Sequence, residues 1–132
     1  MNYWLLKTEP ETYSWADLVR DKKGVWDGVR NFQARKNLGT MAKGDVALIY
    51  HTGDQKAIVG LATVTRAPYP EPKDPAWVAV DLAPDRPLKN PVPLSAIRKD
   101  KPLSGMVLVK VSRLSVQPVR PEEFKRILEL SK

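Results

Sequence analysis

Hydrophobic positions along the chain fall into short runs that polar or glycine-containing turns separate. Apolar runs of about four to eight residues with such boundaries are typical of β-strands. Gly60 lies inside one of these runs and predicts a bulge or a close approach of another group to the backbone. The pattern predicts strands over Asn2–Lys7, Val46–His51, Ala57–Arg66, Trp77–Leu82, Met106–Val111 and Leu114–Gln117.

Helix boundaries are marked by capping residues. Ser14 is followed by Asp17 three positions later, which resembles a capping box and predicts that a helix begins there. Gly39 is expected to close a second, basic helix as a left-handed residue. The predicted helices run from Ser14 to the segment 21–24, over Arg30–Leu38, over Leu94–Lys99 and onward from Pro121, whose first turn carries Glu122 and Glu123.

The order of these elements indicates the fold class. Eight of the twelve prolines lie between Pro68 and Pro93, which predicts a region of loop around a single strand. Strands with interspersed short helices favour a mixed α+β domain built on a curled sheet or small barrel. A length of 132 residues suits one such domain, residues 1–132.

Composition narrows the classes of function. The chain has no cysteine, which excludes disulfides, thiol nucleophiles and cysteine-based zinc sites. Its one histidine gives no recognisable metal site, and we expect neither a metal nor a cofactor. Neither a signal peptide nor a membrane span is indicated, so an intracellular, cytoplasmic protein is expected.

Charge brings in a class of partner. The net charge is +7, from 22 lysines and arginines against 15 acidic residues. A basic surface attracts phosphate backbones, although the same charge also serves solubility alone. Arg30, Arg35 and Lys36 lie on one predicted helix, where they could contact successive phosphates.

One segment carries the chemistry of base recognition. Residues 26–34 read WDGVRNFQA and place Trp26 beside a flexible glycine, Arg30, Asn31 and a glutamine. A flat aromatic surface next to a cation and amides suits a planar polar ring such as a nucleobase. The following Asp27 and Gly28 favour a loop at Trp26, which leaves open whether the ring packs in the core or faces a ligand.

Other polar side chains come at the ends of predicted strands. Lys7 and Thr8 close the first strand, where they could contact a ligand, act as a lysine-activated threonine nucleophile, or lie in solvent. Tyr50 and His51 close another, and a lone histidine is more often a structural donor. Ser115 and Gln117 alternate with Val116, so their side chains leave one face of a strand. No phosphate-binding glycine loop or nucleophile elbow is present, which favours recognition over catalysis.

The order of these motifs resembles a known family. The segments YWLLKTEP at 3–10, YSW at 13–15, WDGVRN at 26–31, QAR at 33–35, GD at 44–45, YH at 50–51, IVG at 58–60 and RLSVQP at 113–118 are similar to those of the EVE domain family over essentially the whole chain. The resemblance implies a PUA-like pseudo-barrel of mostly antiparallel strands with short flanking helices, related to the YTH domains that bind methylated adenine in RNA. It also implies binding of a modified base, such as methylated or hydroxymethylated cytosine, in an aromatic-walled pocket.

The resemblance also assigns roles to individual residues. Trp26 is expected to form a pocket wall, with Lys7 and Thr8 at the mouth. Further lining residues are expected at Ser14, Asn31, Tyr50, His51, Ser115 and Gln117.

The sequence therefore predicts a non-enzymatic, monomeric module that binds a modified base flipped out of DNA or RNA. Two alternatives remain. One is a small hydrolase of modified nucleosides that uses Thr8 with Lys7 and Glu9, as in some PUA-like relatives of the ASCH type. The other is a protein-interaction module that uses the basic face without a base pocket.

Overall fold

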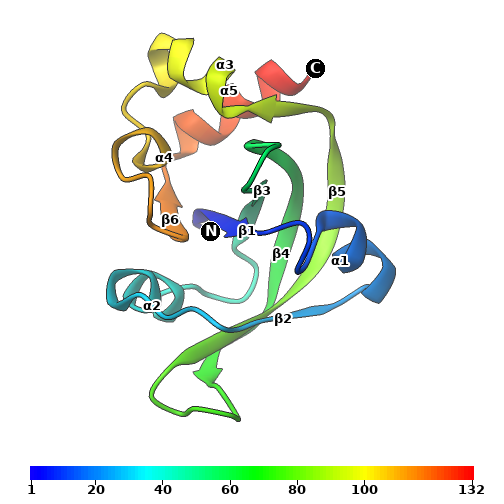
Figure 1. Cartoon of the computed structure of the whole chain (residues 1–132), viewed down its shortest axis with the longest axis vertical. Coiled ribbons are helices and arrows are strands. Elements are labelled where there is room, and N and C mark those ends of the chain that lie inside the picture. The colour runs from blue at the N-terminus through cyan, green and yellow to red at the C-terminus, as the bar shows by residue number, and fades with distance from the viewer.

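The computed structural model describes residues 1–132 and is built on one six-stranded sheet with the order β2-β5-β4-β3-β1-β6 (Figure 1). The β1–β3 pair is parallel and every other neighbouring pair is antiparallel. The mixed α+β class that the sequence predicts is therefore confirmed. The strands are β1 (Tyr3–Thr8), β2 (Gly24–Trp26), β3 (Val46–His51), β4 (Ala57–Pro70), β5 (Val78–Pro93) and β6 (Val116–Val119).

Short helices flank the sheet. They are α1 (Trp15–Asp21), α2 (Phe32–Gly39), α3 (Leu94–Lys99), the 3₁₀ turn η1 (Lys101–Leu103), α4 (Val107–Lys110) and α5 (Pro121–Ser131). The capping box of α1 is confirmed, because the Ser14 hydroxyl accepts from the Asp17 amide while the Asp17 carboxylate accepts from the Ser14 amide. None of the helices has the length and apolarity that a membrane span requires.

The hydrophobic core is divided into two clusters by the sheet. Side chains alternate between the faces of a strand, and β1 sends Leu6 into one cluster and Leu5 into the other. The first core includes Trp26 and Leu38, and the second includes Leu48. In Figure 1, α2 lies on one side of β1, while α3 and α5 lie together beyond its other side.

The proline-rich region differs from the prediction. Instead of loop around one strand, β4 continues to Pro70 and β5 runs unbroken from Val78 to Pro93. These two long strands curve strongly (Figure 1), and their register shifts at four places. Prolines are tolerated at such irregularities, because the ladder there does not need every amide as a donor.

Three local predictions were also wrong. The apolar run Met106–Val111 contains the helix α4 instead of a strand, because a run this short carries no decisive periodicity. Trp26 ends strand β2, where it pairs with Val80 of β5, instead of lying in a loop. Gly39 is the last residue of α2 and not a left-handed cap, since the chain turns on through Thr40, whose amide bonds to the helix carbonyls.

Candidate nucleic-acid interface

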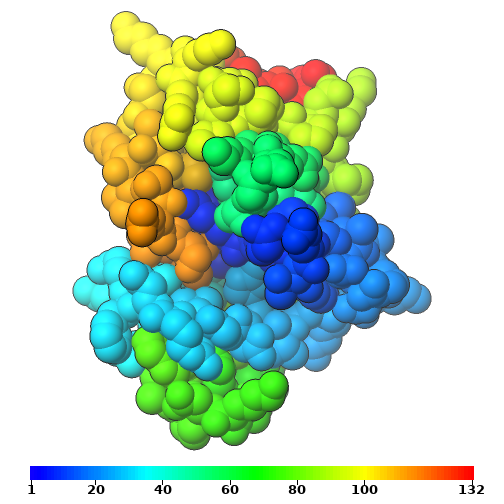
Figure 2. All heavy atoms as spheres, in the orientation of Figure 1, coloured from blue at the N-terminus to red at the C-terminus, as the bar shows by residue number.

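The parallel pairing of β1 with β3 gathers polar residues at one edge of the sheet. It places Lys7 beside Tyr50 and Thr8 beside His51, and the Lys7 amide donates to the Ser115 carbonyl at 2.9 Å. Figure 2 shows a hollow over this edge, with deep-blue atoms of the N-terminal strand at its floor. The orange segment before β6, the green β3–β4 turn and the light-blue segment that leads into α2 surround it. Two cavities open here.

The first cavity has a volume of about 520 Å³. Its wall is formed by the end of β1, by Thr12 and Tyr13 before α1, by residues 25–31 and by Ser115. The charged groups on this wall are Lys7, Arg30, Glu9 and Asp27, so positive and negative charges are equal in number.

Trp26 lies in this wall and in the first core at once. Only 8% of its surface is exposed, so Trp26 packs in the core while it also borders the cavity. Its ring meets that of Tyr13 edge to face, with ring centres 6.3 Å apart. Burial, reinforced by a hydrogen bond to Asp21, raises the pKa of Tyr13 to about 12, so that its hydroxyl stays protonated.

The segment between β2 and α2 is fixed in place by Glu71 from the β4–β5 hairpin. This buried carboxylate accepts from the Gly28 amide at 3.1 Å and from both terminal nitrogens of Arg30. Gly28 has a φ of +77°, a conformation that side chains other than glycine rarely adopt. The Arg30 guanidinium holds the pKa of Glu71 below its ordinary value.

Asn31 has two roles at the rim of the first cavity. Its side-chain oxygen accepts from the Ala34 amide at 2.9 Å and caps α2. The side-chain NH2 group (Nδ2) is left free to donate to a ligand, because the cap uses only the amide oxygen.

The second cavity, of about 600 Å³, lies beside the first and shares Lys7, Thr8, Glu9 and Ser115 with it. Its other walls come from Tyr50, the β3–β4 turn, α3, Leu108 and residues 112–113. Burial raises the pKa of the Tyr50 phenol, so this hydroxyl is also a donor.

Lys7 and Thr8 are neighbours that leave opposite faces of β1. The Thr8 hydroxyl donates to the Tyr13 carbonyl at 2.6 Å, while the Lys7 amine donates to the Ser112 carbonyl and lies 5.9 Å from the centre of the Tyr50 ring. Burial lowers the pKa of Lys7.

Five of the nine expected pocket residues line the first cavity, and a sixth, Tyr50, lines only the second. The other three line neither. The five are Lys7, Thr8, Trp26, Asn31 and Ser115, and the three outside are Ser14, His51 and Gln117.

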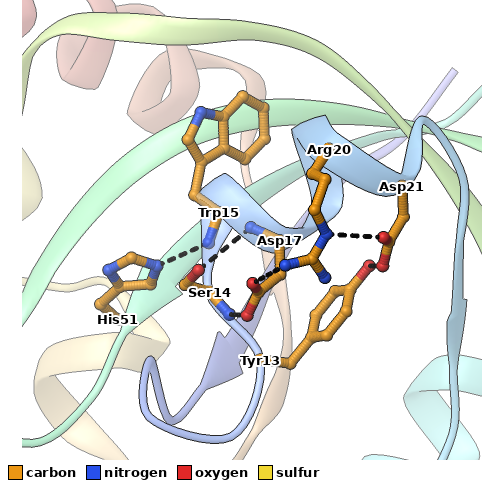
Figure 3. A network of polar contacts seen from close by, with 7 residues as sticks. All are labelled: Tyr13, Ser14, Trp15, Asp17, Arg20, Asp21 and His51. Carbon is orange, nitrogen blue, oxygen red and sulfur yellow. Dashed lines mark hydrogen bonds and ion pairs between the residues drawn. The ribbon is translucent and has the colours of Figure 1, made fainter.

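Ser14 and His51 hold the start of α1 in place (Figure 3). The Ser14 side chain is occupied by the capping box. The Trp15 amide donates to Nε2 of His51 at 2.9 Å, and Nδ1 of the same ring lies 2.7 Å from the Gln55 side-chain oxygen. His51 therefore joins the end of β3 to α1.

Gln117 faces the interior. It pairs with Leu5 of β1 and has no exposed surface. Its side-chain NH2 group donates to the Leu114 carbonyl at 2.8 Å, while its side-chain oxygen is buried without a partner. Ser115 lies just before β6, which begins at Val116 instead of at the predicted Leu114, and it lines both cavities.

The three cations expected to contact phosphates differ in their surroundings. Arg30 lies before α2 instead of on the predicted helix and is engaged by Glu71. The Arg35 guanidinium lies 4.9 and 5.2 Å from the ring centres of Phe32 and Trp77, which stack on each other. Arg35 also donates to the Ala76 carbonyl. Lys36 is exposed in the last turn of α2 without an ion pair.

Several wall residues were not predicted. Tyr13 and Arg113 lie within the YSW and RLSVQP motifs, so the motifs themselves marked them. Lys56 and Arg98 carry no local signal, because only the folded chain brings the β3–β4 turn next to α3.

Comparison with known proteins places this geometry in context. The EVE domain model matches residues 2–130. Thymocyte nuclear protein 1 of Mus musculus is 36% identical over an alignment that covers 98% of this chain and 73% of that protein. An NMR structure of a Rhodopseudomonas palustris protein superposes with a TM-score of 0.95 at 42% identity, covering 99% of this chain and 93% of the other.

A crystal structure of human THYN1 protein in complex with DNA containing 5-methylcytosine is also similar. Its TM-score is 0.91 at 32% identity, with 100% of this chain and 98% of the human chain covered. These neighbours confirm the PUA-like fold that the motifs imply. The match of the family model over nearly every residue leads to one conclusion: the chain belongs to the EVE domain family.

Proposed function

We propose that this protein binds DNA that contains a modified cytosine such as 5-methylcytosine, and that the first cavity holds the modified base. The similarity to the human protein crystallised with such DNA extends over the full length of the chain, which supports the same class of ligand here. The net charge of +7 favours a polyanionic partner.

The composition of the first cavity carries the proposal. Its volume of about 520 Å³ lies within the range of small-molecule sites. A cytosine ring would lie against Trp26, while the free amine of Asn31 would donate to an acceptor on the edge of the base. An apolar corner that receives one methyl group is worth about 0.8 kcal/mol, so we expect a preference of about tenfold or less for the methylated base.

The geometry of Thr8 and Lys7 supports a binding module over a hydrolase. Burial lowers the pKa of Lys7, which is the direction a general base requires. However, the lysine amine and the Thr8 hydroxyl donate to two different carbonyl groups, Ser112 and Tyr13, on opposite sides of the strand. A threonine nucleophile needs its base within hydrogen-bonding distance, and these two side chains are not paired.

A binding measurement tests the proposal. The affinity for a duplex with one 5-methylcytosine is compared with that for the unmodified duplex at fixed salt, in wild type, Trp26→Leu and Leu38→Ala. Leu38 is the control because it is fully buried in the same core and lines neither cavity. Both substitutions leave space in the first core, where such losses cost about 2–5 kcal/mol.

We expect the wild type and Leu38→Ala to prefer the methylated duplex and Trp26→Leu to lose that preference. Equal affinity of the wild type for both duplexes would contradict the proposed function. If both variants lost the preference for the methylated duplex to the same extent, the loss would reflect the damaged core, and the proposed contact between Trp26 and the base would be wrong.

A further inference from the structure

The second cavity differs from the first in its charge. Four cations line it, Lys7, Lys56, Arg98 and Arg113, against the single carboxylate of Glu9. The first cavity has two cations and two carboxylates. The two hollows lie side by side, yet only the second has a clear excess of positive charge.

No acidic partner neutralises these four side chains. The ion pairs of the protein involve Arg20, Lys23, Arg30, Arg120 and Arg126 instead. Glu9 is itself engaged by the Thr52 hydroxyl at 3.1 Å. Like charges that converge on one hollow repel one another, and a bound anion removes that repulsion.

The backbone at Lys56 is strained, which is a second and independent observation. Its φ is +47°, a left-handed conformation that is costly for a residue with a β-carbon. The Leu94 amide donates to the Lys56 carbonyl at 2.7 Å and joins this turn to the start of α3. A glycine would suit the conformation better, yet the position carries a cation on the cavity wall.

We propose that the second cavity binds a phosphate group of the DNA backbone, next to the base that occupies the first cavity. This inference rests on the proposed function. The two cavities meet at the end of β1, where Lys7, Thr8, Glu9 and Ser115 belong to both walls. A nucleotide could therefore place its base on one side of this strand end and its phosphate on the other. Tyr50 adds a neutral hydrogen-bond donor, because burial raises the pKa of its phenol and keeps the hydroxyl protonated.

The proposal moves the principal phosphate contact away from α2. Arg30 and Arg35 of that region are held by Glu71 and by the rings of Phe32 and Trp77, whereas Lys56, Arg98 and Arg113 are exposed and unpaired. Lys36 of α2 is also unpaired, but it lines neither cavity. Cations that are already engaged gain less from a phosphate than free ones do.

Two matched glycine substitutions test the phosphate site. Lys56→Gly removes a cavity charge and relieves a left-handed φ, so the fold is retained. Lys22→Gly is the control, because Lys22 is also an exposed lysine with positive φ, at 62°, but it caps α1 outside both cavities. DNA affinity is measured over a range of salt concentrations.

We expect Lys56→Gly to weaken binding to methylated and plain duplexes by the same factor. It should also flatten the log–log salt dependence by about one unit. Lys22→Gly should keep the wild-type slope. Equal slopes in all three proteins would overturn the phosphate site. The ratio of affinities for methylated and plain DNA tests the base pocket separately, because Lys56→Gly should leave that ratio unchanged.

A neutral methylphosphonate linkage beside the modified cytosine distinguishes the source of the phosphate. It should weaken DNA binding by the wild type. The loss of affinity should be clearly smaller for Lys56→Gly, because that variant already lacks the contact between Lys56 and the phosphate. As the other arm, inorganic phosphate is titrated without DNA and followed by the amide resonances of the β3–β4 turn. One combination of results would overturn the proposal: inorganic phosphate saturates the cavity, and the methylphosphonate linkage leaves DNA binding by the wild type unchanged. The cavity would then be a site for free phosphate.

Discussion

Arg30 and Glu71 are joined by two hydrogen bonds, from Nη1 to Oε2 at 2.7 Å and from Nη2 to Oε1 at 3.0 Å. The same carboxylate accepts from the Gly28 amide, so a buried acid on the β4–β5 hairpin holds the segment that forms one wall of the first cavity. The shape of that wall therefore depends on the ionised state of Glu71.

This pair predicts a specific acid sensitivity. Hydrogen bonds from Arg30 hold the folded-state pKa of Glu71 below the ordinary value of 4.5. The pair's stabilisation is therefore fully present above that value and is lost as pH falls through the folded pKa. We expect Glu71→Gln to lower stability at neutral pH and to reduce its further loss on acidification. Urea unfolding at about pH 7 and about pH 4 measures both effects.

The control for this comparison is Glu11→Gln, which removes an exposed carboxylate that takes part in no ion pair. It should behave as the wild type does. If Glu71→Gln kept the full acid dependence, the ion pair would not be the source of it.

Asn31 allows its structural and binding roles to be separated. Asn31→Ser keeps a side-chain oxygen for the Ala34 amide, and serine caps helices about as well as asparagine. The free amine at the cavity rim is lost. We expect an almost unchanged melting temperature and a loss of affinity for methylated DNA of about threefold to tenfold, the range of one hydrogen bond. Gln33→Ser, at an exposed position outside both cavities, should leave affinity unchanged, and an equal loss there would contradict the prediction.

Gly60 predicts a steric effect that a second glycine lacks. A β-carbon at position 60 would lie 2.6 Å from ring atoms of Trp15, which is closer than atoms can pack. We expect Gly60→Ala to destabilise the protein by about 1–3 kcal/mol. Gly39→Ala adds its methyl group in open space within α2 and should stabilise by up to about 1 kcal/mol. Denaturant unfolding of both variants measures the contrast, and equal effects would mean that Trp15 moves freely.

The last prediction concerns catalysis. We expect the purified protein to leave acylated and methylated nucleosides unchanged over hours of incubation, as measured by chromatography of the products. The reason is that Thr8 and Lys7 donate to separate carbonyl groups. Turnover that disappeared in both Thr8→Ala and Lys7→Ala would replace the binding module with a hydrolase.

Local sequence signals predicted the parts of the fold that local chemistry decides. The capping box of α1 depends on two residues three positions apart, and the start of α5 depends on Pro121 with the acids of its first turn. The close approach at Gly60 was also predicted, although not that Trp15 is the group that approaches.

Features set by distant contacts were not predictable in this way. Trp26 belongs to a strand of three residues that exists because β5 lies beside it, and no pattern of three residues reveals this pairing. Gln117 has the polarity of a ligand-binding residue, but its pairing with Leu5 turns it toward the interior. The cations of the second cavity come from four separate segments, namely β1, the β3–β4 turn, α3 and the turn before β6, so their convergence exists only in the folded chain.

The parallel pairing of β1 and β3 also links ligand binding to folding. The two cavity walls draw on the first strand, the middle of the chain and the segment before β6, which local contacts alone cannot bring together. A partly unfolded chain would therefore have no site, and a ligand would bind only to the complete native state. By mass action, each tenfold excess of ligand over its dissociation constant would raise the global unfolding free energy by about 1.4 kcal/mol, so that protection against hydrogen exchange would extend to core amides far from the cavities.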